Sequence, residues 1–370
     1  MDCFATCTFG VEALVKDELA ALGLKVTATE DARVFFSAER AGVVDANLWL
    51  RCADRVFVSL AVCPAKTFAE LFDHVRAVPW HTLLPRDAKI IVTGKTALSA
   101  LGSVRDVQRI AKKAICDAMI EAHGYARCPE TGQSYNIEIG LLRDVATVAL
   151  NTSGAGLNRR GYRDLEAQAP IRETLAAALV RLAQYRGNEV LIDPCCGSGT
   201  IAIEAAMIAA NIAPGLKRTF AFDGWKAWAQ TAAERREAAA AKRRESGFPH
   251  LYASDIEPKY VTMARRHAIR AGVNGFINFD CRDVRDFNPP APNGVIVVNP
   301  PYGERMEQEQ ASVVLTALKT IRRKHPQFGL YIISSDQTLE KSLGQPADRR
   351  RKLYNGSIKC NLYMYKRVKK

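Results

Sequence analysis

The chain has 370 residues, of which 48% are apolar and 25% are charged. This length is enough for two or three domains with cores of their own, and the composition is typical of a globular protein. No apolar run reaches the length of a membrane-spanning helix, so we expect no membrane association. The net charge of +13, much of it in clusters of Lys and Arg, favours a polyanionic partner.

The ten cysteines and six histidines show no spacing that is typical of a metal site. Because C-x-x-C pairs are missing, we expect no zinc and no other metal. The first residues lack the basic segment and apolar core of a signal peptide. This use of cysteine fits a reducing compartment, so we expect the protein in the cytoplasm.

Residues 2–60 show strand and helix patterns in turn. Apolar residues at helical spacing predict a helix over 11–22, which Gly23 ends. The apolar runs 34–36 and 56–60 are typical of strands. We predict a small α+β domain over residues 1–64 with the order strand, helix, strand, helix, strand.

Residues 65–155 continue in the same way. We expect a strand over 89–92, a long amphipathic helix over 104–120, and two strands, 136–139 and 145–150, that pair with each other. Lys112 and Lys113 lie on the polar side of the long helix. The pattern by itself predicts a second α+β domain with basic helices.

The segment 154–163 is rich in glycine and arginine, and it contains Tyr162 among Arg159, Arg160 and Arg163. Such a composition is typical of a solvated linker between domains. A tyrosine among arginines can also stack on or pair with nucleic acid. Both interpretations stay open.

A strand, a tight glycine turn and a helix follow between residues 190 and 208. Gly197 and Gly199 permit backbone conformations that other residues avoid, and the helix N-terminus favours an anionic group. A P-loop is excluded because it needs Lys after the last glycine, where this chain has Thr200. The glycine spacing also fits a dinucleotide site, but the acidic residue about 20 positions later is missing, and Asp255 lies much further on.

A site for S-adenosylmethionine (SAM) explains one more residue of this turn. Asp193 precedes the glycines and is placed to meet the ammonium group of the cofactor, which a pyrophosphate does not carry. An ordinary strand-to-helix turn without a ligand is the remaining alternative.

The apolar run 295–298 ends in Asn299-Pro300-Pro301-Tyr302-Gly303. Two consecutive prolines make a rigid turn and remove two backbone donors. The Pro300 carbonyl and the Asn299 side-chain oxygen are then free to accept hydrogen bonds from one NH2 group, and Tyr302 offers a ring for stacking a base. We predict a cradle for the exocyclic amine of a flat ring, with Asn299, Pro300, Pro301 and Tyr302 as its catalytic residues.

Two more carboxylates follow predicted strands. Asp255 ends the strand 251–255, where ligands bind in open α/β sheets, and it is placed to hold the ribose hydroxyls, with Glu257 as a weaker substitute. Asp283 follows the next strand and would accept from the adenine amino group, with Val284 against the ring and Asp286 as a rival. Asn355-Gly356 predicts a terminal antiparallel hairpin.

The segments 193–200 and 299–302 resemble those of class I SAM-dependent amino-methyltransferases. Further segments narrow the likeness to the THUMP-domain RNA methyltransferases of the RlmL/YpsC group, namely residues 169–177, 203–206, 211–215 and 351–356. The likeness covers nearly the whole chain. It implies a ferredoxin-like domain over 1–64, a THUMP domain that recognises structured RNA over 65–155, a basic linker over 156–168, and a class I (Rossmann-like) methyltransferase domain over 169–370 with the terminal hairpin.

The patterns and the likeness together give two sets of candidate binding residues. For SAM these are Thr174, Asp193, Pro194, Cys195, Gly197, Gly199, Thr200, Asp255, Ile256, Asp283, Val284 and Asn299. For RNA they are Lys112, Lys113, Arg159, Arg160, Tyr162 and Arg163.

We therefore predict methyl transfer from SAM to an exocyclic base amine of RNA. The likeness implies guanine N2 of 23S ribosomal RNA, either naked or in a ribosomal precursor, whereas the motif alone also allows adenine N6, cytosine N4 or a glutamine amide. The alternatives are a DNA or RNA adenine-N6 methyltransferase, a non-catalytic assembly factor that binds ribosomal RNA, and a nicotinamide dehydrogenase. The oligomeric state stays open.

Overall fold

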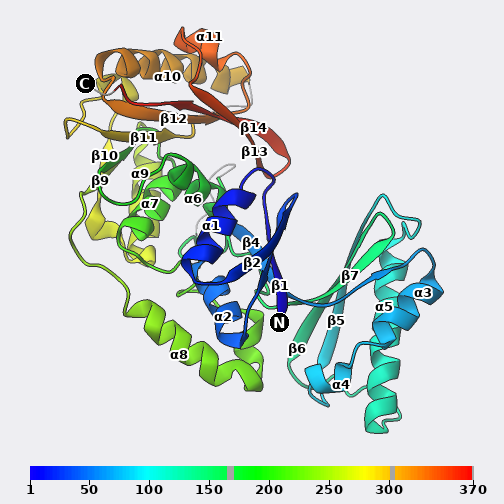
Figure 1. Ribbon diagram of the computed structural model, residues 1–370. Helices are drawn as coiled ribbons and strands as arrows, with labels where there is room; N and C mark the ends of the chain where they lie inside the picture. The colour runs from blue at the N-terminus through cyan, green and yellow to red at the C-terminus, as the bar shows by residue number, and fades with distance from the viewer. Residues whose placement is uncertain (165–170, 301–304, 369–370) are drawn as a thin grey trace.

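The computed structural model describes residues 1–164, 171–300 and 305–368, and of residues 305–311 it describes the backbone alone. Within these ranges the strands form two seven-stranded sheets. Figure 1 shows the sheet of the C-terminal half at the upper left and the sheet of the N-terminal half from the centre to the right. Among the described residues, no helix has both the length and the apolar character needed to cross a membrane.

The N-terminal sheet has the strand order β2-β3-β1-β4-β7-β6-β5. Its strands are β1 (Asp2–Cys7), β2 (Lys25–Glu30), β3 (Arg33–Ser37), β4 (Ala53–Pro64), β5 (Lys89–Ala97), β6 (Ser134–Leu142) and β7 (Val145–Asn151). The long strand β4 pairs with β1 on one edge and with β7 on the other. The predicted boundary at residue 64 therefore falls at the end of a strand that both N-terminal domains share.

The helices that cover this sheet are α1 (Glu12–Ala21), α2 (Arg40–Trp49), α3 (Phe68–Arg76), α4 (Trp80–Leu83) and α5 (Val104–His123). The predicted helices over 11–22 and 104–120 correspond to α1 and α5. The prediction for residues 2–60 lacked β2, so the observed order is strand, helix, two strands, helix, strand. Five of the six residues of β2 are exposed, and an exposed strand shows no apolar run in the sequence.

The C-terminal sheet has the strand order β10-β9-β8-β11-β12-β14-β13. Its strands are β8 (Val190–Asp193), β9 (Leu251–Asp255), β10 (Ile277–Cys281), β11 (Gly294–Val298), β12 (Phe328–Ser334), β13 (Arg349–Asn355) and β14 (Ile358–Tyr365). Strands β8 to β12 are mutually parallel, whereas β14 is antiparallel between β12 and β13. Because the order reverses between β8 and β11, a crevice for a ligand is expected at the carboxyl ends of these two strands.

Helices pack on both faces of the C-terminal sheet, with α10 and α11 on one face and α6, α7 and α9 on the other (Figure 1). They are α6 (Glu173–Leu182), α7 (Thr200–Ala209), α9 (Pro258–Ala271), α10 (Arg305–Lys324) and α11 (Leu339–Leu343), with short 3-10 turns η3 (Asn274–Phe276) and η4 (Val284–Asp286). The predicted terminal hairpin is present, with Gly356 at a φ of +63° in its turn. The second strand of the hairpin, β14, lies between β12 and the first strand, β13, so the first strand forms the edge of the sheet.

The insertion after α7 in the C-terminal half packs against the N-terminal half. It contains η1 (Ala221–Gly224), η2 (Lys226–Trp228) and α8 (Ala229–Ala240). The buried Trp225 ring stacks on Tyr135 of β6 at 4.8 Å between centroids, and its Nε1 donates to the Ser134 carbonyl at 3.1 Å. Arg235 of α8 pairs with Asp45 of α2, with 2.8 Å between Nε and Oδ1.

The segment 156–164, which was expected to be part of a solvated linker, is instead packed between the halves. Arg160 is 3% exposed and pairs with Glu204 of α7, with 3.3 Å from Nε to Oε1, and its Nη2 donates to the Arg51 carbonyl at 2.6 Å. Tyr162 is 2% exposed and its hydroxyl donates to Glu204 at 3.2 Å. The prediction that Arg160 and Tyr162 contact RNA is therefore wrong, because both side chains are used inside the protein. Residues 165–168 of the expected linker lie outside the described residues.

The neighbouring Arg159 and Arg160 allow a direct test of this packing. Arg160→Ala leaves the Glu204 carboxylate buried without its partner, so we expect a loss of about 3–5 kcal/mol of stability. Arg159 is exposed, so Arg159→Ala is expected to change stability by less than about 0.5 kcal/mol. Denaturant unfolding followed by circular dichroism and by tryptophan fluorescence measures both. Equal midpoints for the two variants would contradict the buried pair, and Arg160→Met combined with Glu204→Leu is expected to recover part of the loss.

Candidate active site

The glycine turn joins β8 to α7 at the carboxyl edge of the C-terminal sheet. The Cys196 N–H donates to the Ser254 carbonyl at 2.9 Å, which anchors the turn to β9, and the Gly199 N–H donates to the Cys196 carbonyl at 2.8 Å. Gly197 and Gly199 have φ angles of +51° and +81°, in the left-handed region that favours glycine.

The two glycines serve different needs. A Cβ on Gly199 would lie 2.8 Å from the Ala264 Cβ, so this glycine lets α9 pack closely against the turn. A Cβ on Gly197 would meet no atom within 4 Å. The turn is therefore packed tightly behind Gly199 and is open at Gly197, where a ligand can approach the backbone.

Asp193 ends β8 and is buried, with 1% of its surface exposed. Its Oδ1 accepts from the Cys195 N–H at 3.3 Å, while its Oδ2 has no hydrogen-bond partner among the described residues. Burial raises the pKa of this carboxyl to about 8, and the nearby Asp255 adds to the rise. A buried carboxyl with an unpaired oxygen fits a cationic ligand group, which would restore its charge.

Asp255 ends the neighbouring strand β9. Its Oδ2 accepts from the Gly197 N–H at 2.8 Å and its Oδ1 accepts from the Glu257 N–H at 3.0 Å. These bonds fix the carboxylate beside the open glycine. Ile256 follows with 60% of its surface exposed, so its side chain is available for a contact with a flat apolar ring.

Asp283 lies beyond β10, where it caps η4. It accepts from the Arg285 N–H at 2.8 Å and pairs with the Arg285 guanidinium at 2.6 Å, and this pairing lowers the pKa of the Asp283 carboxyl. Val284 is buried in the core with Ile192 and Ile296. The Asp283 carboxylate is thus held by an arginine that the sequence did not single out.

Asn299 follows β11 at the same edge of the sheet. Its Oδ1 is buried and has no hydrogen-bond partner among the described residues, and the next residue, Pro300, is buried as well. Pro301 and Tyr302, which were also predicted to be catalytic, lie outside the described residues. Because β11 pairs with β8, the unpaired oxygens of Asn299 and Asp193 come from the ends of adjacent strands.

The other predicted cofactor residues surround the same turn. Thr200 starts α7 and Thr174 lies in the first turn of α6, and both are buried. Pro194 and Cys195 belong to the turn itself. In the part of the chain that the structure describes, no cluster of three or more His, Cys, Asp or Glu could hold a metal ion.

Arg163 and His267 hold the glycine turn through hydrogen bonds. The sequence analysis did not identify this role. The Arg163 Nη2 donates to the Thr200 hydroxyl at 2.8 Å and to the Ile171 carbonyl at 3.1 Å. The fully buried His267 of α9 places its Nδ1 3.2 Å from the Ser198 carbonyl. Arg163 was also predicted to bind RNA; its guanidinium is partly buried and bonded within the protein, and this assignment stays a prediction. This supporting role had no signal in the sequence, since Thr200 lies 37 residues from Arg163 and Ser198 lies 69 residues from His267.

The remaining RNA candidates stand apart from the turn. Lys112 and Lys113 of α5 pair with Glu130 at 2.8 Å and with Asp117 at 2.9 Å, which neutralises part of their charge. Arg159 is exposed. These three assignments stay predictions.

SAM carries hydrogen-bond donors that match the acceptors of this crevice. The buried Asp193 suits an ammonium group, the backbone at Gly197 is open, and Asp255 and Ile256 lie beside it. Together with the strand order, these features define a SAM-dependent methyltransferase of Rossmann-like fold.

Comparison with known proteins gives the family. Residues 160–364 match the RMKL-like methyltransferase domain, residues 2–57 match the RlmL ferredoxin-like domain, and residues 65–151 match the THUMP domain. The chain belongs to the RMKL-like methyltransferase family. The predicted family, fold class and cofactor are thereby confirmed.

Three relatives illustrate the likeness. The protein named "Putative RNA methyltransferase YpsC" of Bacillus subtilis (strain 168) is 40% identical over 369 residues, which are 98% of this chain and 94% of that protein. The structure of "a predicted N6-adenine-specific DNA methylase" from Listeria monocytogenes str. 4b F2365 is 38% identical, with a TM-score of 0.94 over 99% of this chain and 96% of that one. SMU.472, "a putative methyltransferase complexed with SAH" (S-adenosylhomocysteine), is 35% identical, with a TM-score of 0.92 over 100% of this chain and 99% of that one.

The raised pKa of Asp193 predicts a pH-dependent affinity for SAH, which carries the same ammonium group as SAM. With its pKa at about 8, the carboxyl of the free protein is protonated at pH 6–7 and must lose its proton to pair with the ammonium. Affinity is therefore expected to rise by about tenfold per pH unit between pH 6 and 7 and to level off above pH 8.

Isothermal titration calorimetry in buffers of different ionisation enthalpy measures both the affinity and the released proton. Asp193→Asn is expected to remove the pH dependence and to weaken binding by about tenfold or more at pH 8. Asp280→Asn, at an exposed carboxylate of β10, serves as the matched control. An unchanged pH profile in Asp193→Asn would rule out this role.

Proposed function

We propose that this protein methylates an exocyclic amine of an RNA base, and that guanine N2 of 23S ribosomal RNA is the target. The observation that carries the proposal is the buried, unpaired Oδ1 of Asn299 at the end of β11, beside the cofactor crevice. A buried acceptor without a donor is costly, and the NH2 group of a base that has left its stack would supply one. The THUMP domain and the name of the YpsC relative support RNA as the substrate.

The cofactor residues have distinct proposed roles. Asp193 would bind the ammonium group, Asp255 would bind the ribose hydroxyls, and Asp283 would accept from the adenine amino group, with Ile256 and Val284 beside the ring. The remaining members of the set are Thr174, Pro194, Cys195, Gly197, Gly199, Thr200 and Asn299. When bound, SAM supplies an electrophilic methyl group on a positively charged sulfur.

Asn299 and Pro300 would orient the target amine. The Asn299 Oδ1 and the Pro300 carbonyl each accept one hydrogen of the NH2 group, which turns the nitrogen lone pair into the crevice. Pro301 would complete the turn, and Tyr302 would stack on the base. Alignment is the main contribution of these groups, and no strong general base is required.

Two alternative functions are compatible with the same site geometry. Adenine also carries an exocyclic amine, and the Listeria relative is named as a DNA methylase specific for adenine N6. A non-catalytic assembly factor would keep the RNA-binding domain but would not need the unpaired Asn299 oxygen. We favour RNA because a THUMP domain precedes the methyltransferase domain. The cytoplasmic location stays a prediction.

The target is tested by methyl transfer from labelled SAM. Unmodified ribosomal RNA, precursor particles that lack the modification and DNA are offered in parallel, and the nucleosides of each product are identified by mass spectrometry. We expect N2-methylguanosine from RNA or from the particles. N6-methyladenine in either nucleic acid would overturn the guanine assignment, and no product from any substrate would favour the assembly factor.

The role of Asn299 is tested by Asn299→Ala. Removal of the acceptor is expected to lower kcat by at least about a hundredfold, because the amine is no longer held in line. SAH affinity is expected to fall far less, because the other members of the cofactor set remain. Asn278→Ala, at an exposed asparagine of β10, is the matched control and is expected to keep full activity. Retained activity in Asn299→Ala would contradict the proposed mechanism.

A further inference from the structure

An exposed aromatic ring and a lysine meet where the N-terminal half touches the terminal hairpin. Phe9, in the loop between β1 and α1, is 43% exposed, and its ring lies edge to face with Tyr354 of β13 at 6.4 Å and 77°. The Lys352 Nζ lies 5.9 Å from the centre of the Phe9 ring and 5.4 Å from that of Tyr354. We call these three residues the Phe9 cluster.

The loop that carries Phe9 is fixed on both sides. The Glu12 carboxylate accepts from the Gly10 N–H at 2.9 Å and from the Ala32 N–H at 3.0 Å. Gly10 has a φ of +93°, and a Cβ at this position would lie 2.7 Å from the Lys352 carbonyl oxygen. Phe9 is therefore held outward by a loop pressed against β13, which suits a preformed contact surface.

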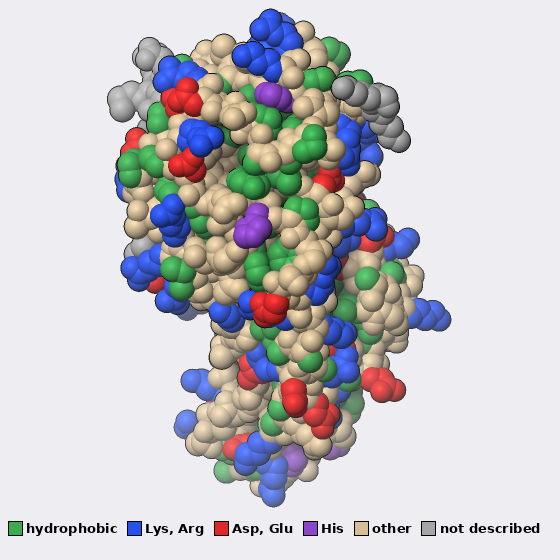
Figure 2. Space-filling model, turned by 90° about the vertical axis from the view of Figure 1, so that its left-hand side faces the viewer, with side chains coloured by type: hydrophobic (Ala, Val, Ile, Leu, Met, Phe, Trp, Pro, Cys, Tyr) green, Lys and Arg blue, Asp and Glu red, His purple; other side chains and the backbone are tan. Residues whose placement is uncertain are grey.

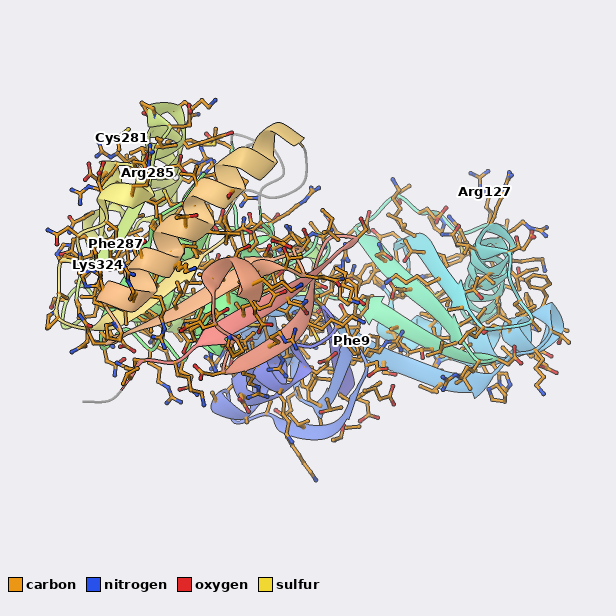
Figure 3. The ribbon with its side chains drawn as sticks, turned by 90° about the horizontal axis from the view of Figure 1, so that it is seen from above. Phe9, Arg127, Cys281, Arg285, Phe287 and Lys324 are labelled. Carbon is orange, nitrogen blue, oxygen red and sulfur yellow. The ribbon has the colours of Figure 1, made fainter. Side chains whose placement is uncertain are left out.

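The cluster lies at the same edge of the sheet as the active site. Strand β13 runs parallel to β11, because both β12 and β13 are antiparallel to β14. Tyr354 lies near the carboxyl end of β13, and Asn299 lies just beyond the carboxyl end of β11. Three strand spacings separate these two strands in the sheet. This is about 14 Å across the sheet. In the view of Figure 3, Phe9 lies between the methyltransferase domain and the THUMP domain.

The chemistry of the cluster matches a nucleotide of an unpaired strand. A base stacks on an exposed aromatic face, and an ammonium group beside it pairs with the phosphate. Lys359 lies opposite Tyr354 on β14 and adds positive charge. On the face that Figure 2 shows, by contrast, Lys and Arg side chains lie scattered among acidic and apolar ones. Arg266 and Arg270 on α9 both pair with Asp164, which offsets part of their charge.

We propose that Phe9, Lys352 and Tyr354 form a subsite for an unpaired nucleotide that neighbours the target base. The base stacks on Phe9, which Tyr354 braces edge-on, and Lys352 turns from the rings to the phosphate. The subsite rests on the proposed function, since it holds the strand whose next residues reach Asn299. A single exposed phenylalanine is common on protein surfaces. Phe9 differs because contacts from two domains hold its ring exposed beside a lysine.

The test separates stacking from charge. Binding of a fluorescent oligoadenylate to the full chain is measured by anisotropy over a range of salt concentrations. Phe9→Ala is expected to weaken binding by about tenfold without changing the salt slope. Lys352→Ala is expected to reduce the slope of log Kd against log salt by about 0.7, as for one phosphate contact on a single strand. Phe9→Trp keeps a stacking surface and is expected to bind within about twofold of the unchanged protein.

Ile269→Ala is the matched control, because Ile269 is also exposed but lies on α9, away from the THUMP domain (Figure 1). SAH affinity, measured in parallel, is expected to be unchanged in all variants. If Phe9→Ala and Ile269→Ala bind the oligonucleotide equally, the subsite is wrong. Since this assay needs no methyl transfer, it gives its answer even if the RNA substrate proposed above proves wrong. Where RNA is methylated, Phe9→Ala must also raise KM for RNA more than it lowers kcat, and the opposite split would overturn the subsite.

Discussion

The buried ion pair between Arg160 and Glu204 is the contact on which the relation between the two halves depends. Glu204 lies on α7, whose first turn follows the glycines of the cofactor crevice. Arg160 also reaches the Arg51 carbonyl in the N-terminal half. Charges buried this deeply tolerate few arrangements, because any displacement leaves one of them unpaired in a medium that solvates it poorly. The glycine turn is therefore fixed relative to the N-terminal sheet.

Two further contacts make this relation rigid over a wide area. Trp225 of the insertion stacks on Tyr135 of β6, and the Gly10 loop presses against β13. They lie in different parts of the interface, so together with Arg160 they oppose rotation of one half against the other. Under the function proposed above, an RNA-binding domain at a fixed position would select the target base by its distance from the bound RNA structure.

The crevice is lined by hydrogen-bond acceptors, and two of them have no donor within the described protein. Asp193 and Asn299 each keep one buried oxygen without a partner among the described residues, at the ends of adjacent strands, whereas Asp255 and Asp283 are already held by protein groups. For the two unpaired oxygens we propose the ammonium group of SAM and the target amine, and for the two held carboxylates we propose the ribose hydroxyls and the adenine amino group. Local discrimination between guanine and adenine is weak at such a site, because both bases present an NH2 group. Under the proposed function, the fixed position of the N-terminal domains and the proposed subsite for a flanking nucleotide would therefore carry more of the specificity.

The sequence by itself determined the elements whose signals are local. The glycine turn, the strand before Asn299 and the hairpin at Asn355-Gly356 each follow from residues that are neighbours in the chain, and parallel strands necessarily bring their carboxyl ends to one edge. The tertiary structure alone decided which charges are buried and which strands are adjacent. Arg160, Tyr162 and Arg163 form part of a basic segment that looks solvated, and only the fold brings Glu204 and Thr200 to them. Strand β2 is exposed and shows no apolar run, and β14 lies between β12 and β13. The physical reason is that burial and pairing depend on partners far apart in sequence, which a local pattern of residues does not encode.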